Sequence, residues 1–452
     1  MKYYFFLLLT ISVFSLNIYA QNIKRKASFG AYVLEINDSI AKVYELKMLD
    51  GILVEKIIPN TTASNLKLVE KDIILKVNDV EIKNSTTFTS TIKNLRENDV
   101  VSVNIIRSGK PKTLKGKAIG KPLEISDDYE IIYDEVSYNN GYIRTIITKP
   151  KNITKAPTIL FIPGYLCYSL DNIGKHPYGQ LVDGLTKKGY VVMRVEKLGE
   201  GDCINTPNCK DVDLQTEIDG FEKGLQSLKK YDFVDTNNIF IWGHSLGGIE
   251  APILAERNKV KGIVVAGTGL ISWYEYILNM FRFQNPLMGA DYVENEEEIA
   301  EYKKLLFEYL VMKKTPLELS ENKKYKELLE NGMQFDGKDR IWDRNYKYWQ
   351  QIDDLNQPKA FKNSEAHVLS IWSSADLEAF SEDEHKTIAD IVNYYHPGKG
   401  TYLRMENTTH AFAKVKSMKD GIENSNYDYI INNFNPEILE ETHKWIQNIL
   451  QK

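Results

Sequence analysis

One tight turn constrains this chain more than any other feature of its sequence. Residues 243–248 read GHSLGG, between an apolar run at 239–242 that predicts a strand and a helical pattern that begins near Leu246. A turn this short needs glycine at its flanks, and it lifts the side chain of Ser245 above the end of the strand. The sequence therefore predicts an accessible serine, a candidate nucleophile, at a strand–turn–helix junction.

Charge and cysteine content restrict what else the chain can bind. Its 452 residues are enough for two or three domains, and 43% hydrophobic residues allow large buried cores. The net charge is -5 without a strongly basic run, which disfavours nucleic acid because phosphates need a concentrated positive face. The seven His and three Cys form no CxxC or HxxxH spacing, so we expect no metal site.

Residues 1–20 have the organisation of a secretory signal peptide. Lys2 supplies a positive charge, residues 5–16 are almost continuously apolar, and Ala20 is the small residue before a predicted cleavage site. The alternative is an uncleaved membrane anchor, but the apolar run is shorter than the ~20 residues that a spanning helix needs. We therefore expect an exported protein, periplasmic or secreted, with no membrane span after signal cleavage.

Residues 27–120 have the composition of a small β-rich domain, with short runs of Val, Ile, Lys and Thr bounded by Asn, Asp, Gly and Pro. Three stretches are characteristic: GILVEKIIPNTTASNLKL (51–68), KDIILKVNDVEI (71–82) and VVSVNIIRSGK (100–110). With them, the region resembles bacterial PDZ domains. Lys71 and Asn65 depart from the resemblance, because they stand where that family usually has glycine.

By this resemblance, Phe29, Gly30, Ala31 and Tyr32 occupy the position of the loop that binds a peptide carboxylate. Such a loop presents successive backbone N–H groups to a peptide C-terminus, while the neighbouring strand edge pairs with the peptide. The resemblance therefore implies a peptide C-terminus as a partner. The alternative is a β-rich domain that only docks on its neighbour.

Residues 121–452 alternate short apolar runs with amphipathic helical patterns. The runs that predict strands are residues 158–162, 190–195, 239–242, 262–266, 368–372 and 401–405. This alternation predicts an α/β fold with a mostly parallel sheet covered by helices on both faces. Residues 271–360, long, charged and aromatic-rich, interrupt it and predict an inserted helical cap.

A serine nucleophile needs a base, because its hydroxyl reacts poorly at neutral pH. His410 lies in a loop just after the run at 401–405 and is the candidate general base. Asp376 follows the preceding run, at 368–372, and is the candidate carboxylate that orients the imidazole. Glu378 is the alternative to Asp376.

The other histidines near these motifs fit the role of base less well. His396 lies before the last predicted strand, at its wrong end. His385 and His443 fall in helical patterns, so we expect both at the surface. His244, inside the turn, is expected to pack against its neighbours.

Two backbone N–H groups are candidates for an oxyanion hole. Leu246 directly follows the nucleophile at a helix N-terminus. Tyr165 lies in the loop after the first parallel strand, where Gly164 lets the backbone turn its next N–H towards the serine. The alternative is an ordinary glycine turn.

Four short stretches lie in the order expected along the chain: FIPGY (161–165), GHSLGG (243–248), SSAD (373–376) and TTH (408–410). With them, the chain resembles the α/β-hydrolase superfamily over about residues 130–452. The resemblance implies a serine hydrolase that forms an acyl-enzyme and needs no metal or organic cofactor. We expect a carboxylic-ester hydrolase with small-molecule ester substrates. The alternatives are a serine peptidase, aminopeptidase-like, on the same residues and, more remotely, a non-catalytic peptide-binding protein.

Two further expectations concern the cap and the cysteines. Some aromatic side chains of residues 273–283 and 342–349 are expected to line an apolar acyl pocket. Export exposes the chain to oxidising conditions, so we expect a disulfide between Cys203 and Cys209, with Cys167 as a free thiol. A loop this short gains little entropy from closure, so the bridge should contribute little to global stability.

Overall fold

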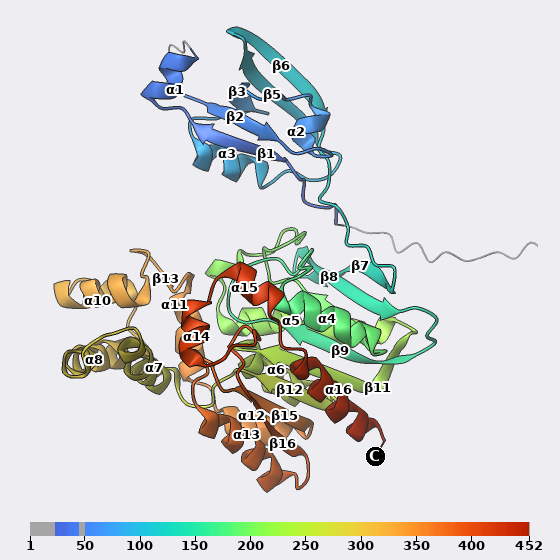
Figure 1. The fold of residues 1–452 in the computed structure, drawn as a ribbon, viewed down its shortest axis with the longest axis vertical. Coiled ribbons are helices and arrows are strands. Elements are labelled where there is room, and N and C mark those ends of the chain that lie inside the picture. The colour runs from blue at the N-terminus through green and yellow to red at the C-terminus, as the bar shows by residue number, and fades with distance from the viewer. Residues whose placement is uncertain (1–22, 45–49, 452) are drawn as a thin grey trace, which may run out of the picture.

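The computed structural model describes residues 23–44 and 50–451, which form two large sheets, a separate two-stranded hairpin and their helices (Figure 1). The predicted signal peptide, residues 1–20, lies outside the described residues. Within the described ranges, no helix is both long enough and apolar enough to cross a bilayer.

The N-terminal sheet is small and antiparallel, with the strand order β1-β2-β3-β5-β6 and β4 paired to β3. Its strands are β1 (Ala31–Glu35), β2 (Ile52–Ile57), β3 (Ile73–Val77), β4 (Val80–Glu81), β5 (Val100–Arg107) and β6 (Lys110–Lys117). Its helices are α1 (Asp38–Val43), α2 (Thr62–Asn65) and α3 (Ser85–Ile92). Helix α3 packs on the sheet through Phe88, whose ring meets that of Phe29 edge to face at 5.1 Å between centroids.

The two positions that depart from the glycine pattern behave differently. Lys71 has a φ of 72°, so its backbone adopts the left-handed conformation that favours glycine. Asn65 instead ends α2, and its side-chain amide donates to the backbone oxygen of Lys117 at 2.9 Å. The turn at Lys71 therefore keeps its backbone geometry without the usual residue.

The second sheet has eight strands in the order β16-β15-β12-β11-β9-β10-β8-β7. They are β7 (Tyr129–Tyr138), β8 (Gly141–Pro150), β9 (Ala156–Ile162), β10 (Val191–Val195), β11 (Val234–His244), β12 (Gly262–Ala266), β15 (His367–Ser373) and β16 (Gly400–Met405). Strand β8 is antiparallel to both of its neighbours, and every pair from β10 to β16 is parallel. The predicted α/β fold class is confirmed.

Helices cover both faces of this sheet and bury its two apolar surfaces. One face packs against α4 (Pro177–Lys187) and α16 (Glu437–Leu450). The other packs against α5 (Leu214–Ser227), α6 (Gly247–Arg257), α12 (Gln357–Ser364) and α13 (Glu382–Tyr395). In α16 the buried positions Ile438, Trp445, Ile446 and Ile449 recur at helical spacing, which places them on the side that meets the sheet.

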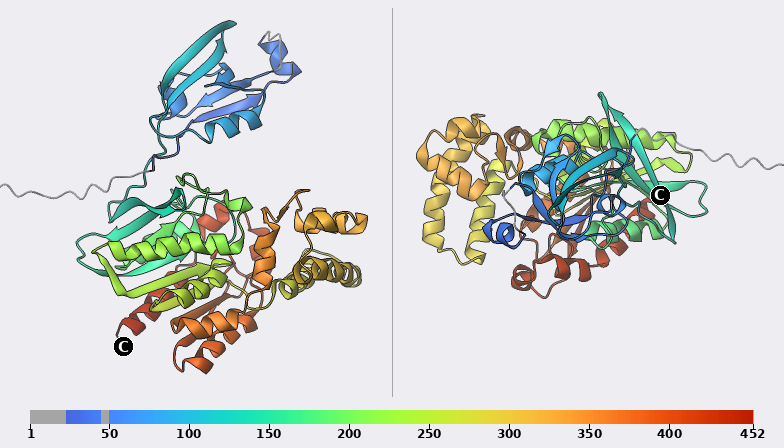
Figure 2. Two further views of the ribbon diagram at one scale, coloured as in Figure 1. Left: turned by 180° about the vertical axis from the view of Figure 1, so that it is seen from behind. Right: turned by 90° about the horizontal axis from the view of Figure 1, so that it is seen from above.

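A helical insertion separates β12 from β15 and lies to one side of the sheet (Figure 2). It comprises α7 (Trp273–Leu287), α8 (Tyr292–Leu306), η3 (Phe307–Val311), α9 (Pro316–Leu319), α10 (Lys323–Met333), the hairpin β13 (Arg340–Ile341) and β14 (Arg344–Asn345), and α11 (Tyr346–Asp353). We call this insertion, from α7 to α11, the cap.

Four short elements lie outside the cap: η1 (Cys209–Asp211), η2 (Leu228–Lys230), α14 (Met418–Glu423) and α15 (Tyr427–Asn432).

Arginines anchor the N-terminal sheet region to the larger one. Arg25 pairs with Asp171 at 2.7 Å and with Asp202 at 2.6 Å, and all three side chains are buried. Arg96 donates to the backbone oxygens of Asp202 at 2.8 Å and of Cys203 at 2.7 Å. The N-terminal region thus holds the loop after β10.

Candidate active site

Ser245 lies in the sharp turn between the end of β11 and the start of α6. Its φ is 55°, which is unusual for a residue with a side chain, and its N–H donates to the backbone oxygen of Ala266 at 2.9 Å. A Cβ added to Gly243 would lie 2.2 Å from the backbone oxygen of Gly247, and one added to Gly247 would lie 2.5 Å from that of Ile162. Only glycine fits at either flank, which explains the GHSLGG pattern.

Asp376 and His410 meet beyond the ends of β15 and β16. The imidazole Nδ1 of His410 lies 2.9 Å from Oδ2 of Asp376, whose side chain is fully buried. The other oxygen of Asp376 accepts the backbone N–H groups of Glu378 and Ala379, both at 2.8 Å. A Cβ on Gly267 would lie 3.1 Å from His410 Nδ1, so the pair packs closely on the end of β12.

Glu378, the alternative carboxylate, lies on the other side of the imidazole. Its Oε2 is 2.7 Å from His410 Nε2, and its side chain is 57% exposed, whereas Asp376 is enclosed. Burial disfavours the imidazolium, but Asp376 and Glu378 together raise the pKa of His410 well above its ordinary value. Burial also opposes ionisation of Asp376, yet His410 and the two backbone N–H groups hold the pKa of Asp376 below its usual range.

Two buried histidines support this arrangement. His244 Nε2 lies 3.0 Å from the backbone oxygen of His410, and burial lowers the pKa of His244 well below its ordinary value, so the neutral ring donates this hydrogen bond. The prediction that His385 lies at the surface is wrong. Its ring is fully buried in α13, and its Nε2 accepts the backbone N–H of Thr268 at 3.1 Å. The helical pattern around His385 gave no sign of this, because its partner is remote in sequence.

The loop after β9, residues 163–167, passes directly beside Ser245. A Cβ on Gly164 would lie 3.2 Å from the Cβ of Ser245, which is tighter than ordinary van der Waals contact, so glycine favours this close approach. Tyr165 and Leu246, the two candidate oxyanion donors, line the same cavity as Ser245.

That cavity has a volume of about 480 Å³, and Ser245, His410 and Glu378 all line it. The cap contributes the aromatic side chains Trp273, Tyr276, Phe281, Trp342 and Trp349 to its wall. The Trp273 ring stacks with those of Tyr276 and Trp349, at centroid distances of 4.6 and 4.8 Å. The cavity is therefore largely aromatic and apolar on the cap side, and Glu378, which contacts His410 Nε2, contributes the one carboxylate of its lining among the described residues.

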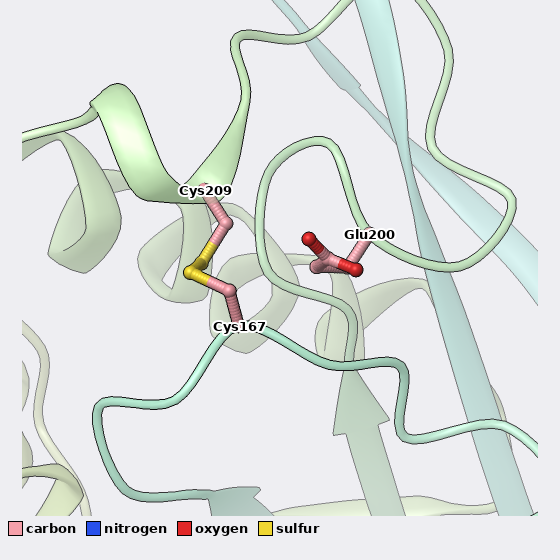
Figure 3. Close-up of side chains that lie close together, drawn as sticks. All are labelled: Cys167, Glu200 and Cys209. Carbon is pink, nitrogen blue, oxygen red and sulfur yellow. A yellow bond between two sulfur atoms is a disulfide. The ribbon is translucent and has the colours of Figure 1, made fainter. Parts of the chain in front are cut away.

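The predicted disulfide between Cys203 and Cys209 is wrong. The structure joins Cys167 to Cys209, with 5.8 Å between the two Cα atoms (Figure 3). Cys203 is the free, buried thiol among the described residues. The thiol of Cys203 instead donates to the backbone oxygen of Lys197 at 3.5 Å. Glu200 brings a carboxylate oxygen within 4.8 Å of both sulfurs of the bridge, but those sulfurs are bonded to each other. The fold therefore ties the loop beside Ser245 to η1.

The residues of the predicted carboxylate-binding loop lie at the start of the N-terminal sheet. Phe29 is buried, and Gly30 has a φ of 73°, where a Cβ would lie 2.2 Å from Thr61 Oγ1. Ala31 begins the edge strand β1, next to which α3 packs, and the side chain of Tyr32 is 56% exposed. Among the described residues, no strand pairs with the outer edge of β1, beside α3.

Comparisons with known proteins agree with this two-part organisation. The model of the PDZ domain matches residues 21–117, and that of the prolyl oligopeptidase family matches residues 185–321. Esterase EstD of Thermotoga maritima is 27% identical over 158 residues, which are 34% of this chain and 37% of that protein. A probable periplasmic serine endoprotease, DegP-like, of Marinomonas is 24% identical over 97 residues, 22% of this chain and 21% of that protein.

The chain therefore spans only about a third of the first relative's length and a fifth of the second's. Among solved structures, Est1E from Butyrivibrio proteoclasticus is 14% identical, with 71% of this chain and 99% of that chain covered and a TM-score of 0.42. The strand order of the large sheet and the two family models together identify this chain as an N-terminal PDZ domain joined to a domain of the α/β-hydrolase fold.

Proposed function

We propose that this protein is an exported carboxylic-ester hydrolase that acts through Ser245, His410 and Asp376. The observation that carries the proposal is the shared cavity. It is lined both by Ser245, whose backbone is in the left-handed conformation, and by His410, which is paired with the buried Asp376. A serine, a base and a carboxylate that orients the base can together perform acyl transfer.

In the proposed reaction, His410 Nε2 accepts the proton of Ser245 Oγ as that oxygen attacks the ester carbonyl. Glu378 now contacts Nε2, so its carboxylate must leave that nitrogen before the serine can use it. Asp376 stays ionised and stabilises the imidazolium. His410 then protonates the leaving alcohol, and a water activated by the same nitrogen hydrolyses the acyl-enzyme.

The backbone N–H groups of Leu246 and Tyr165 are the proposed donors to the oxyanion. Leu246 lies one residue beyond the nucleophile, at the start of α6, where the helix dipole favours negative charge. Tyr165 reaches the same cavity from the loop after β9. Two such donors stabilise the tetrahedral intermediate more than the planar ester, and this difference lowers the barrier.

The aromatic wall favours an apolar acyl group in the substrate. The cap rings offer flat, apolar surface, and the cap also contributes the amide side chains of Gln284 and Asn285 to the lining. Trp273 lines the cavity, whereas its neighbour Tyr274 lines a separate surface hollow with Phe307 and Met312. Trp273→Ala should therefore change the preferred acyl chain length, and Tyr274→Ala should not.

A serine peptidase of aminopeptidase type is the second candidate, and Glu378 favours it. Its carboxylate, 57% exposed, is placed at the serine end of the cavity, where it can pair with an amine next to the scissile carbonyl. An ester hydrolase for neutral acyl groups has no need of this charge. Glu378→Gln should abolish a preference for aminoacyl substrates while leaving neutral esters nearly unaffected at high pH.

Two further parts of the proposal concern location and partner. The predicted signal peptide and the Cys167–Cys209 disulfide both favour an oxidising compartment, periplasmic or extracellular. The free edge of β1, with Tyr32 and Leu34 exposed beside α3, supports binding of a peptide C-terminus by strand addition.

A panel of p-nitrophenyl esters and aminoacyl anilides tests the proposed function. We expect turnover of short and medium acyl esters by the wild type and none above background by Ser245→Ala. Preference for anilides over esters would replace the first candidate with the second. Turnover that persists in Ser245→Ala would contradict both candidates.

A further inference from the structure

A buried ionic cluster that the proposed mechanism does not use lies against the loop beside Ser245. It consists of Lys197, which follows β10, Glu217 of α5, and Arg344, the first residue of β14 in the cap. The side chains of Lys197 and Glu217 are 2% exposed and that of Arg344 is 1% exposed. Charges this deeply buried are costly unless each finds partners, so their contacts show what they hold.

The cluster binds two consecutive carbonyl groups of the loop. Lys197 Nζ donates to Glu217 Oε1 at 2.8 Å and to the backbone oxygen of Gly164 at 2.7 Å. Arg344 donates through Nη2 to Glu217 Oε2 at 2.7 Å and through Nη1 to the backbone oxygen of Tyr165 at 2.6 Å. A single carboxylate thus fixes two cations, and each cation fixes one carbonyl.

This arrangement determines where the Tyr165 N–H points. A trans peptide group is planar, with its C=O and N–H on opposite sides. Because Lys197 draws the carbonyl of Gly164 to one side, the N–H of Tyr165, in the same peptide group, faces the other. A cation at the carbonyl also polarises the peptide group, which makes that N–H a stronger donor.

The charges of the cluster depend on one another. Burial lowers the pKa of Lys197, and the neighbouring charge of Glu217 opposes that shift. Burial alone would favour protonated Glu217, but Lys197 and Arg344 lower the pKa of Glu217 to about 2. Glu250 of α6 also faces the cluster, and burial together with the charge of Glu217 raises the pKa of Glu250 well above its ordinary value. Glu217 is therefore the carboxylate that stays ionised over the physiological range.

Arg344 also makes the loop depend on the cap. Trp342 and Asp343 form the turn of the β13–β14 hairpin, with φ values of 45° and 62°. Trp342 lines the cavity, and Arg344, two residues later, crosses to the loop. One hairpin therefore both encloses the substrate space and holds the backbone next to Ser245.

We propose that Lys197 and Arg344, both held by Glu217, are positioning residues for the Tyr165 oxyanion donor. Lys197 orients and polarises the peptide group that carries the Tyr165 N–H, and Arg344 fixes the peptide group that follows it, so that docking of the cap sets the geometry of the oxyanion hole. The proposal rests on the proposed function of Ser245. It predicts that loss of the clamp weakens binding of the tetrahedral state much more than binding of the ester itself.

The test compares Arg344→Met, Arg344→Lys and Lys197→Met with Arg340→Met. Arg340 is the matched control, because it lies in the same hairpin but pairs with Asp211 near the surface. Rates on p-nitrophenyl butyrate are divided by the concentration of sites titrated with a fluorophosphonate, which removes the effect of misfolded protein. The inhibition constant of butylboronic acid, which forms a tetrahedral adduct with a serine, is measured in parallel.

We expect kcat to fall about 100-fold in Arg344→Met and Lys197→Met, similar to the loss of one oxyanion donor, with KM within about threefold of wild type. Affinity for the boronic acid should fall by a similar factor. Arg344→Lys keeps the charge but lacks the forked geometry, so it should recover part of the rate, to about a 10-fold loss. Arg340→Met should stay within about twofold of wild type.

Two results would overturn the inference. If kcat per titrated site and boronic-acid affinity stay near wild type in the Arg344 and Lys197 variants while the melting temperature falls, the cluster only stabilises the fold. If Arg344→Met yields no folded protein, the same comparison in Arg344→Lys decides. A wild-type protein that hydrolyses no ester or anilide refutes the proposed function and this inference together, whereas active wild type with unaffected variants refutes this inference alone.

Discussion

The two sides of Ser245 are built in different ways. On the base side, Asp376 and His410 come from loops at the ends of neighbouring strands, and Glu378 contacts the imidazole while more than half exposed at 57%. On the oxyanion side, Gly164 and Tyr165 are held by side chains from three separate segments, and each of these side chains is at most 2% exposed.

This difference follows from what each side has to do. A general base changes its protonation state and its hydrogen-bond partner in every turnover, so it needs access and a tunable pKa. Oxyanion donors act best when they do not move, because their orientation is then fixed before the charge develops. The base side is accordingly exposed at Glu378 and comes from residues 376–410, whereas the oxyanion side is wholly buried and assembled from residues farther apart in sequence.

The largest expected effect is on the base side. Ser245→Ala and His410→Ala should each lower kcat/KM about 10⁴-fold or more, because the nucleophile and its base act as one unit. Asp376→Asn should lose less, about 10³-fold, since the imidazole remains present but poorly oriented. Ester hydrolysis by the purified variants measures this. Near wild-type activity in Asp376→Asn, together with its loss in Glu378→Gln, would show that the carboxylate is misassigned.

Independence of the two sides is tested by combining variants. If the base side and the oxyanion side act separately, the factors by which Asp376→Asn and Arg344→Lys each lower kcat should multiply in the double variant, to within about threefold. A sensitive fluorogenic ester allows the slow double variant to be measured. If kcat of the double variant is no lower than that of Asp376→Asn alone, Arg344 acts through the base, and the two sides of Ser245 are not independent.

The disulfide should stabilise the fold more than the sequence suggested. Cys167 and Cys209 are 42 residues apart, so the bridge closes a much longer loop than the expected pair would have done. Removing it with Cys209→Ala should lower the free energy of unfolding by about 2–4 kcal/mol, as measured by urea denaturation without reductant. Cys203→Ala is the control, with an expected loss of about 1 kcal/mol. Peptide mapping that finds Cys203 linked to Cys209 would contradict the structure.

The smallest effect should be a shift of the pH profile. Asp376 and Glu378 raise the pKa of His410, and the base must be neutral to act, so activity is lost as pH falls through that pKa. Glu378→Gln removes one of the two anions and should lower the pKa, moving the acidic limb of kcat/KM for a neutral ester to lower pH. His244 also faces this ring but is neutral, because burial lowers its own pKa. An unmoved limb would show that Glu378 does not influence the free base.

Local signals were sufficient for much of the fold. The apolar run at 262–266 coincides with β12 and that at 368–372 lies within β15, because buried parallel strands are short and continuously apolar. The turn around Ser245 was recognisable for a similar reason: its geometry demands glycine at positions adjacent in sequence.

Contacts between remote residues were not predictable. Cys203 is close to Cys209 in sequence, but its thiol is buried and donates to the backbone oxygen of Lys197. Cys209 instead bonds to Cys167, which lies in the loop after β9. Glu217 lies in an amphipathic helix and resembles any surface charge in the sequence. Its partner Arg344 is 127 residues away, so only the packing of the cap on α5 shows that both are buried.

Covalent labelling by a fluorophosphonate shows directly whether Ser245 is the activated nucleophile. Mass spectrometry of the digested, labelled protein should find one adduct, on the peptide that contains Ser245, with labelling abolished in Ser245→Ala and strongly slowed in His410→Ala. Folded wild-type protein that forms no adduct, or forms it on another residue, would contradict the central claim that Ser245 is the activated nucleophile.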